Sequence, residues 1–407
     1  MNKIPELLSP AGDPEKMRFG IAYGADAVYM AGQRFGMRAA AANFDDEALR
    51  RCIAEAHAHG VKCYITVNIM PSCRDLPALP AYLELLQDAG ADAMIVADVG
   101  VIRMAQKYAP GVPLHISTQT SILNPEAANF WADMGAERVV LARELSLEEI
   151  AEIRAKTPKS LEIEAFVHGA MCISYSGRCL ISQYMTGRDA NHGACAQPCR
   201  WNYSLMEEKR PGQFFPVEED GRGTYLYNSK DMCMIEHVPE LIEAGITSFK
   251  IEGRNKTAYY AACVTGAYRA AIDTYKKDPE NFVLPQFCRD EVNKVSHREY
   301  YTGFYFGNQE NGQHYGDSQY IREYEVVGMP VECDDSGKAV FALKNRFFDG
   351  EELELIQPGQ APYVFRAENV TDDEGTKREL FNVPQMRVHF VFPFKVSEWA
   401  ILRKAKE

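Results

Sequence analysis

The 407-residue sequence contains no long uninterrupted hydrophobic run. No apolar stretch approaches the roughly 18 residues that a membrane-spanning helix needs, and the first strand-like segment starts within a few residues of Met1. We therefore expect neither a membrane anchor nor a secretory signal peptide. A cytoplasmic location is expected as well. The 46% share of hydrophobic residues is ordinary for a globular protein, with enough chain for one large domain and a smaller one.

An excess of positive charge is also missing. The sequence has 44 Lys and Arg against 57 Asp and Glu, which gives a formal net charge of −13. A protein that coats nucleic acid by bulk attraction needs a basic face, so this charge argues against that mode of binding. A local basic pocket is still compatible with the composition.

Recognisable hydrolase motifs are absent as well. The sequence contains neither the H-E-x-x-H helix of zinc proteases nor the G-x-S-x-G turn of serine hydrolases. Its 11 cysteines are odd in number and have no secretory signal before them, which disfavours a disulfide framework. Reduced thiols, some of which bind metal, fit this pattern better.

A strand-like run followed by a helical run recurs over about the first 275 residues. Four of the joints carry a glycine just before an apolar run, at Gly24, Gly90, Gly135 and Gly245. Glycine is favoured there because the residue after a helix C-terminus adopts positive φ. Asp13-Pro14 and the capping box that begins at Ser146 predict two of the helix starts.

The repeats predict eight strands, most of them apolar runs typical of parallel strands that are buried on both faces. They are Glu6–Leu8, Ala27–Met30, Lys62–Val67, Ala93–Ala97, Leu114–Ser117, Arg138–Leu141, Leu161–Val167 and Ser248–Ile251. Eight strands alternating with helices favour an α/β fold of the (β/α)8 TIM-like barrel type over an open doubly wound sheet. We expect this barrel over residues 1–277, with a cysteine-bearing insertion at about 168–247 after the seventh strand.

The pattern changes towards the C-terminus. Residues 278–308 are expected to form a linker. Residues 309–407 contain short strand-like runs separated by turn clusters such as Asp334-Asp335-Ser336-Gly337. They predict a second domain, a small antiparallel β-barrel.

Four cysteines gather within 28 residues of the insertion: Cys172, Cys179, Cys195 and Cys199. Their number and ligand type suit either a four-thiolate zinc site or an iron–sulfur cluster. Structural zinc sites usually combine two pairs of closely spaced cysteines. Here only Cys195 and Cys199 are closely spaced, so the spacing favours an iron–sulfur cluster. We interpret Cys52, Cys63, Cys73, Cys263, Cys288 and Cys333 as buried thiols that act as small hydrophobes.

Polar residues follow most of the predicted strands. In TIM-like barrels the chemistry takes place at the C-terminal ends of the strands, which makes these residues candidates for the site: Ser9 to Gly12, Gly32, Asn68, Asp98, Gln119, Arg143, His168, Glu252 and Arg254. Some of them are expected only to cap the next helix.

The segments Glu164 to Cys172 and Gly177 to Ser182 resemble the signature of the U32 family, the collagenase-like peptidases. Further matches are Leu8 to Gly12, Gly24 to Tyr29 and Lys250 to Arg254. Within this family, the likeness points to proteins that convert the wobble uridine of tRNA to 5-hydroxyuridine with prephenate and without oxygen.

The resemblance implies a [4Fe–4S] cluster held by Cys172, Cys179, Cys195 and Cys199, with Cys233 as a rival for the fourth place. For a dicarboxylate such as prephenate, the cations near the barrel mouth are Arg143, Arg178, Arg188 and Arg254. Glu252 and His168 are the candidate acid or base groups. The protein is therefore expected to act on tRNA together with a small carboxylate metabolite.

Two alternatives to this function stay open. The family name suggests a peptidase in which Cys172 and His168 form a nucleophile and base, although a thiolate bound to iron is not free to attack a carbonyl. A non-catalytic subunit of a hydroxylation complex is the second alternative.

The C-terminal domain is similar to barrels of translation factors, which implies that it positions RNA. A stabilising or oligomerisation role fits its acidic loops equally well.

Overall fold

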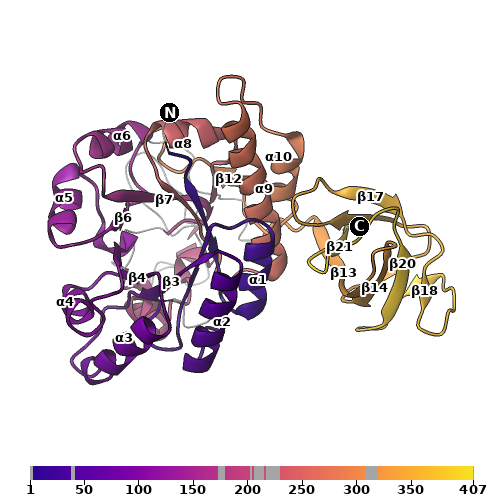
Figure 1. Ribbon diagram of the computed structural model, residues 1–407, viewed down its shortest axis with the longest axis horizontal. Helices are drawn as coiled ribbons and strands as arrows, with labels where there is room; N and C mark the ends of the chain where they lie inside the picture. Colours follow the sequence, from indigo (N-terminus) through magenta and orange to yellow (C-terminus); the bar gives the residue numbers. More distant parts are fainter. Residues whose placement is uncertain are drawn as a thin grey trace.

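Eight parallel strands close into a barrel in the computed structural model, which describes residues 3–37, 42–172, 179–201, 204–205, 215–216, 230–307 and 320–406 (Figure 1). The strands pair in chain order, and β11 closes the ring by pairing with both β1 and β7. Their bounds are β1 Glu6–Pro10, β2 Ala27–Met30, β3 Lys62–Val67, β4 Ala93–Val96, β5 Leu114–Ile116, β6 Arg138–Val140, β7 Glu162–Ala170 and β11 Ser248–Ile251. The predicted (β/α)8 barrel is confirmed.

Helices cover the outside of the barrel (Figure 1). They are α1 Pro14–Ala22, α2 Asp46–Ala58, α3 Leu79–Asp88, α4 Val99–Tyr108, α5 Pro125–Asp133, α6 Leu147–Ala155, α8 Val238–Glu243 and α9 Ala258–Lys277, with the 3₁₀ turns η1 Leu76–Ala78, η2 Thr118–Thr120 and η5 Ile235–His237. Asp13 caps α1, and Ser146 with Glu149 forms the predicted capping box of α6. The four predicted joint glycines all have positive φ.

Charged residues fill the N-terminal end of the barrel. The buried Arg138 guanidinium contacts Glu6 at 2.6 Å, Glu162 at 2.5 Å and Glu164 at 3.0 Å. Burial opposes the ionisation of Glu164, but Lys250 and Arg138 together hold the pKa of this carboxyl below its usual range. This network closes one end of the barrel, so an accessible cavity has to lie at the other.

The predicted insertion after β7 contains short elements: α7 Ile181–Thr186, η3 Ala190–His192, η4 Pro198–Arg200, β8 Ser204–Leu205, β9 Phe215–Pro216 and β10 Asp231–Cys233. Strand β10 runs antiparallel to β7, and β12 (Tyr300–Tyr301) adds to β10. Helix α10 (Gln286–Asn293) also follows α9. The buried Cys288 and Val292 of α10 belong to the hydrophobic core of the barrel, so the described part of the predicted linker packs against the barrel.

The C-terminal domain is a curled antiparallel sheet of seven strands in the order β17-β16-β21-β13-β14-β20-β18. Their bounds are β13 Tyr324–Cys333, β14 Lys338–Leu343, β16 Glu352–Ile356, β17 Tyr363–Arg366, β18 Thr371–Asp372, β20 Arg387–Val391 and β21 Ile401–Ala405, and a two-stranded ribbon joins β15 Phe347–Phe348 to β19 Leu380–Phe381. The predicted small antiparallel domain is present, with a core of its own around Phe341, Phe347 and Phe390.

Helices α9 and α10 lie between the barrel and the C-terminal sheet (Figure 1). Trp399 packs its ring edge-on against Phe19, with centroids 5.5 Å apart, and its carbonyl accepts a hydrogen bond from the Tyr23 hydroxyl. Ile356 and Ile401 of the sheet belong to the barrel's hydrophobic core. The helices in the described ranges include none with the length and apolar character that crossing a membrane requires.

Candidate functional site

A cavity of about 360 Å³ lies at the C-terminal ends of the barrel strands. Its walls come from residues that follow β3, β5, β6, β7 and β11, and the cysteine-bearing insertion closes it from above. Of the residues predicted from strand ends, this barrel cavity is lined by Asn68, Gln119, Arg143, Glu252 and Arg254. Asp98 instead caps α4, as expected for some of the set.

Lys250 forms the floor of the barrel cavity. Its ammonium group lies 2.6 Å from Glu164 and 4.6 Å from the centroid of the Tyr29 ring. Only 5% of the residue is exposed. Because Glu164 also contacts Arg138, the floor is continuous with the charged network at the other end of the barrel.

Arg143 and Glu252 face each other across the wall. One Nη of Arg143 donates to the carbonyl of Ala170 at 2.8 Å, and the other lies 3.8 Å from a carboxylate oxygen of Glu252. The guanidinium also stacks over Phe166, 3.9 Å from the ring centroid. The planar group is therefore fixed in orientation before any ligand arrives.

Arg254 is almost fully buried in the same wall. Its Nη1 donates to the Thr66 hydroxyl at 3.4 Å, and its Nη2 donates to the carbonyl of Met37. Lys250 lies on β11, and the segment that follows the strand, from Glu252 to Lys256, also lines the cavity. The end of β11 thus contributes a continuous part of the wall.

Several buried polar atoms of the barrel cavity have no hydrogen-bond partner within the described part of the chain. They are Nε2 of Gln119, Nε of Arg143 and Oδ1 of Asn191. A buried donor without a partner costs about 1–3 kcal/mol, so these atoms indicate a polar ligand. Two of the three are donors, and with Lys250 and Arg254 nearby they suit a carboxylate.

All four cysteines of the predicted quartet line the barrel cavity: Cys172, Cys179, Cys195 and Cys199. Within the described residues, however, no three Cys, His, Asp or Glu side chains lie close enough together to hold a metal ion. The thiols therefore share one cavity without forming a ligand cage. Their chemistry fits an iron–sulfur cluster, which is bound by four thiolates.

Local interactions hold the cysteine-bearing loops in place. The hydroxyl of Ser182 in α7 accepts a hydrogen bond from the amide of Ala196 at 2.9 Å, next to Cys195. Asp189 accepts from the amide of Asn191 at 2.8 Å and binds His192 at 2.7 Å. The amide of Met70 bonds to the carbonyl of Asn191 at 3.2 Å, which ties the insertion to the loop after β3.

His168 does not line the barrel cavity. Its ring is buried among Tyr260, Tyr268 and Tyr300, and burial, assisted by the charges of His297 and Lys256, lowers its pKa to about 3. A β-bulge explains the position: Lys250 pairs with Phe166 while Ile251 pairs with His168, so Val167 is an extra residue that reverses the alternation. A neutral, enclosed imidazole is poorly placed to act as an acid or base.

Cys233 lies beside His168 on β10 and is likewise not among the residues that line the cavity. Burial raises the pKa of its thiol to about 12. The described geometry therefore places Cys199, and not Cys233, with the other three thiols.

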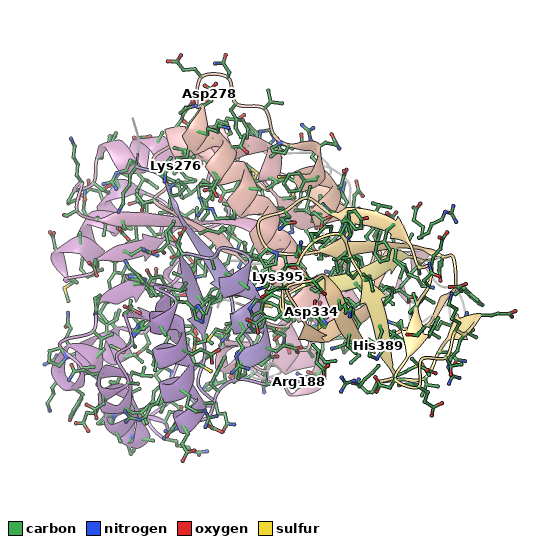
Figure 2. The ribbon with its side chains drawn as sticks, turned by 45° about the vertical axis from the view of Figure 1, so that its right-hand side comes forward. Arg188, Lys276, Asp278, Asp334, His389 and Lys395 are labelled. Carbon is green, nitrogen blue, oxygen red and sulfur yellow. The ribbon has the colours of Figure 1, made fainter. Side chains whose placement is uncertain are left out.

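The remaining predicted residues lie elsewhere. Arg188 is exposed and does not line the cavity (Figure 2), and Arg178 lies outside the described residues. Of the other cysteines, four are buried as expected. The interpretation is wrong for Cys73, which is exposed, and Cys333 is half-buried.

The cavity also contains residues that were not predicted from the sequence, among them Lys250 and Asn191. Lys250 carries a usable signal, because it lies near the C-terminal end of the predicted strand Ser248–Ile251, next to the candidates Glu252 and Arg254. Asn191 carries none, since its position depends on how the insertion folds over the barrel.

Comparison with known proteins agrees with this architecture. The family model "Peptidase family U32" matches residues 12–315, and "Peptidase family U32 C-terminal domain" matches residues 322–403. The chain is 38% identical to tRNA hydroxylation protein P1 of Bacillus subtilis, over 100% of this chain and 96% of that protein. It is 38% identical to tRNA hydroxylation protein P of Escherichia coli (91% and 90% covered) and 30% identical to a collagenase of Porphyromonas gingivalis (93% and 94% covered).

Proposed function

The chain belongs to peptidase family U32, and we propose that it is an enzyme that hydroxylates the wobble uridine of tRNA at C5, with prephenate as co-substrate. One observation carries the proposal: two buried donors, Gln119 Nε2 and Arg143 Nε, have no hydrogen-bond partner among the described residues and lie at a cavity that is also lined by Lys250 and Arg254. The relatives named for tRNA hydroxylation, which match this chain over nearly its whole length, support the choice of RNA.

In this proposal the chain's own residues bind and orient the co-substrate. Arg143 offers Nε and Nη2 to one carboxylate, while Gln119 and Lys250 bind polar groups deeper in the cavity. Glu252, 3.8 Å from Arg143, is the candidate acid or base. Cys172, Cys179, Cys195 and Cys199 would hold a [4Fe–4S] cluster, which supplies one-electron transfer when bound.

Peptide hydrolysis is the competing function, because one relative is named collagenase. A thiol protease needs a base within reach of its nucleophile. Cys172 lines the cavity, but the enclosed His168 does not, and its pKa near 3 makes it a weak base. These observations favour hydroxylation.

The decisive experiment deletes the gene in its host and measures tRNA nucleosides by mass spectrometry. We expect 5-hydroxyuridine to disappear from the tRNA. It should return with the wild-type gene and with Cys73→Ser, which changes an exposed thiol away from the cavity, but not with Cys172→Ser.

The purified protein is tested in parallel for cleavage of collagen. Unchanged tRNA together with collagen cleavage that Cys172→Ala abolishes would establish the peptidase. Lost modification in cells, without conversion of tRNA by the purified protein and prephenate, would point to the non-catalytic subunit.

The cofactor is tested by anaerobic purification followed by metal analysis and paramagnetic resonance. We expect about four irons per chain, a loss of iron in Cys199→Ser, and retained iron in Cys233→Ser. Stoichiometric zinc without iron would contradict the cluster, and the reverse pattern for the two variants would assign the fourth ligand to Cys233.

A further inference from the structure

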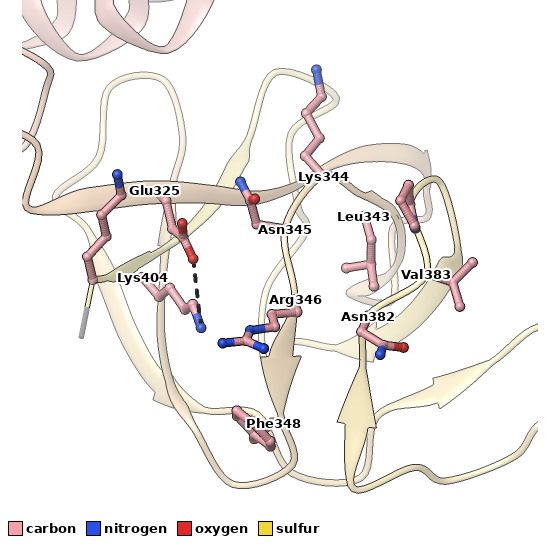
Figure 3. A pocket seen from close by; sticks show the side chains of 11 residues that line it. Glu325, Leu343, Lys344, Asn345, Arg346, Phe348, Asn382, Val383 and Lys404 are labelled. Atoms are coloured by element: carbon pink, nitrogen blue, oxygen red, sulfur yellow. Dashed lines mark ion pairs between the residues drawn. The ribbon is translucent and has the colours of Figure 1, made fainter.

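A second hollow, of about 760 Å³, lies on the C-terminal domain (Figure 3). Its walls are two loops, residues 344–346 and residues 382–384, and Lys404 and Lys406 of the last strand region complete it. We call this hollow the C-terminal groove. Figure 3 shows Arg346 directed to the same part of the hollow as Lys404 and Glu325, with Lys344 and Phe348 at opposite ends of the view.

Backbone and amide hydrogen bonds hold both loops of the C-terminal groove. The amides of Lys344 and Asn345 donate to the carbonyl of Val327, where β13 has a bulge, and Asn345 Nδ2 donates to the carbonyl of Val326 at 2.8 Å. The amide of Gln385 bonds to the carbonyl of Leu343 at 2.9 Å. The groove is therefore formed before anything binds in it, which lowers the entropy cost of binding.

Three cations of the C-terminal groove are exposed. Lys344, Arg346 and Lys406 are exposed, and none of them forms an ion pair with another described residue. Lys404 differs, because it is buried and lies 2.8 Å from Glu351. In a chain of net charge −13, three exposed cations in one hollow create a local positive potential for a polyanion.

The C-terminal groove also exposes apolar surface. Phe348 is 42% exposed and Val383 is 50% exposed, and both line it. An aromatic ring beside exposed cations is the combination that binds single-stranded nucleic acid, because a base stacks on the ring while the cations bind phosphates.

The groove and the barrel cavity both adjoin one cleft. A cleft of about 820 Å³ between the two domains shares Lys344 and Asn345 with the groove, and shares Asn255, Lys256 and Tyr320 with the barrel cavity. The cleft and groove together are lined by seven Lys or Arg residues and by only two acidic residues among those described, Glu15 and Glu325.

Tyr320 marks the junction of the cleft with the barrel cavity. The Lys256 ammonium and the Arg298 guanidinium each lie 4.4 Å from its ring centroid, and Arg322 lies 5.7 Å from it. Lys256 and the buried Arg298 each also lie 3.8 Å from Asp231, so this carboxylate balances part of their charge, and the exposed Arg322 adds a further cation to the junction.

We propose that the C-terminal groove and the cleft bind the single-stranded loop of the RNA substrate and guide it to the barrel cavity, a proposal that rests on the proposed function. Lys344, Arg346 and Lys406 bind phosphates, and a base stacks on Phe348. The side-chain amide of Asn382 and the cleft that adjoins both the groove and the barrel cavity favour RNA over an acidic protein segment, because in the proposed function an RNA loop has to reach the barrel cavity.

The test measures binding of a 17-nucleotide RNA hairpin with a loop uridine to the full chain by fluorescence anisotropy at several salt concentrations. Arg346→Glu and Lys344→Glu should each weaken binding about ten-fold and reduce the salt slope by about 1. Phe348→Leu should weaken binding with an unchanged slope. The matched control is Lys395→Glu, an equal charge change at an exposed residue that is paired with Asp335.

The outcomes separate this inference from the proposed function. Equal binding by Arg346→Glu and Lys395→Glu overturns the inference, even if tRNA hydroxylation is established. Groove-dependent hairpin binding without any hydroxylation supports the inference and refutes the proposed function. A groove variant that changes only self-association, measured by sedimentation without RNA, overturns the inference and makes the groove an interface between copies. Circular dichroism confirms that each exposed variant is folded.

Discussion

At the residue scale, the cations of the barrel cavity differ in how much of their bonding capacity the protein already uses. Lys250 is held by Glu164 at 2.6 Å and lies against Tyr29. Arg143 donates through Nη1 to Ala170, but its Nε has no partner in the described part of the structure. Arg143 therefore has a donor available for a hydrogen bond to a carboxylate ligand.

We predict that Arg143→Gln weakens prephenate binding about ten- to hundred-fold, because a hydrogen bond to a charged group is worth about 1.5–3 kcal/mol. Isothermal titration calorimetry of the purified protein measures this change. Arg188→Gln is the control, since Arg188 is exposed and does not line the cavity. This variant should bind prephenate with the affinity of the wild type. Equal losses in both variants would argue against the cavity as the carboxylate site.

His168 makes the stability of the protein depend on pH. Its pKa is lowered to about 3 in the folded chain by burial and returns to about 6.5 on unfolding. The unfolded chain therefore binds more protons between these values, so the free energy of unfolding falls as the pH drops from about 6.5 towards 3, by up to about 1.4 kcal/mol per pH unit.

We predict that His168→Phe flattens this dependence. Phenylalanine suits the ring cluster of Tyr260, Tyr268 and Tyr300 and does not titrate, and Tyr300 keeps its 2.7 Å hydrogen bond to the carbonyl of Val292. Urea denaturation at pH 7, 6 and 5 measures the slope. His59→Phe, at an exposed histidine, should leave the slope unchanged, and equal slopes in all three proteins would contradict the assignment.

At the scale of elements, the site depends on how closely the ends of β7 and β11 approach each other. The amide of Glu252 donates to the carbonyl of His168 at 2.9 Å, just before the two strands separate. Gly169 has a φ of +107°, and a Cβ atom there would lie 2.4 Å from the carbonyl oxygen of Glu252. Only glycine permits this approach.

We predict that Gly169→Ala lowers the free energy of unfolding by about 2–4 kcal/mol, through left-handed backbone strain and a forced shift of the Glu252 segment. Gly187→Ala is a matched control, because Gly187 has a φ of +70° and no described residue lies within 4 Å of the added Cβ. It should cost only about 1 kcal/mol. Chemical denaturation compares the two, and equal losses would show that the close approach is unimportant.

At the scale of the whole molecule, Arg403 joins the C-terminal sheet to the barrel. This residue is fully buried and contacts Glu354 of the sheet at 2.6 Å, as well as Glu291 of α10 and the Tyr259 hydroxyl of α9, the latter at 3.0 Å. The cleft that continues the C-terminal groove lies between the same two domains. Its shape therefore depends on this contact.

We predict that Arg403→Met lowers stability by about 3–5 kcal/mol, because Glu291 and Glu354 are left buried without their main partner. Scanning calorimetry should show separate transitions for the sheet and the barrel in place of one. Lys395→Met, which removes only an exposed pair with Asp335, should change the midpoint little. A single transition with the same small shift in both variants would mean that the domains are joined by other contacts.

Local sequence was sufficient to predict the eight strands, the capped helices and the cysteine-bearing insertion. A buried parallel strand is a short apolar run, and glycine after a helix reflects a backbone angle that other residues resist. The residues that follow strand ends include Gln119, Arg143, Glu252 and Arg254, which line the barrel cavity. They meet there because the C-terminal ends of all barrel strands lie at the same face. The same rule for strand ends could have added Lys250, which lies near the C-terminal end of its strand.

What the sequence determined by itself is thus the barrel, the second domain and the residue types of the site, because each depends on interactions within a few turns or strands. Only the tertiary structure decided which of these residues meet. A one-residue bulge at Val167 turned His168 out of the barrel cavity, and the joined cleft and groove arise where loops of two domains come together. Such contacts depend on strand register and domain packing between residues far apart in the chain, which no local pattern encodes.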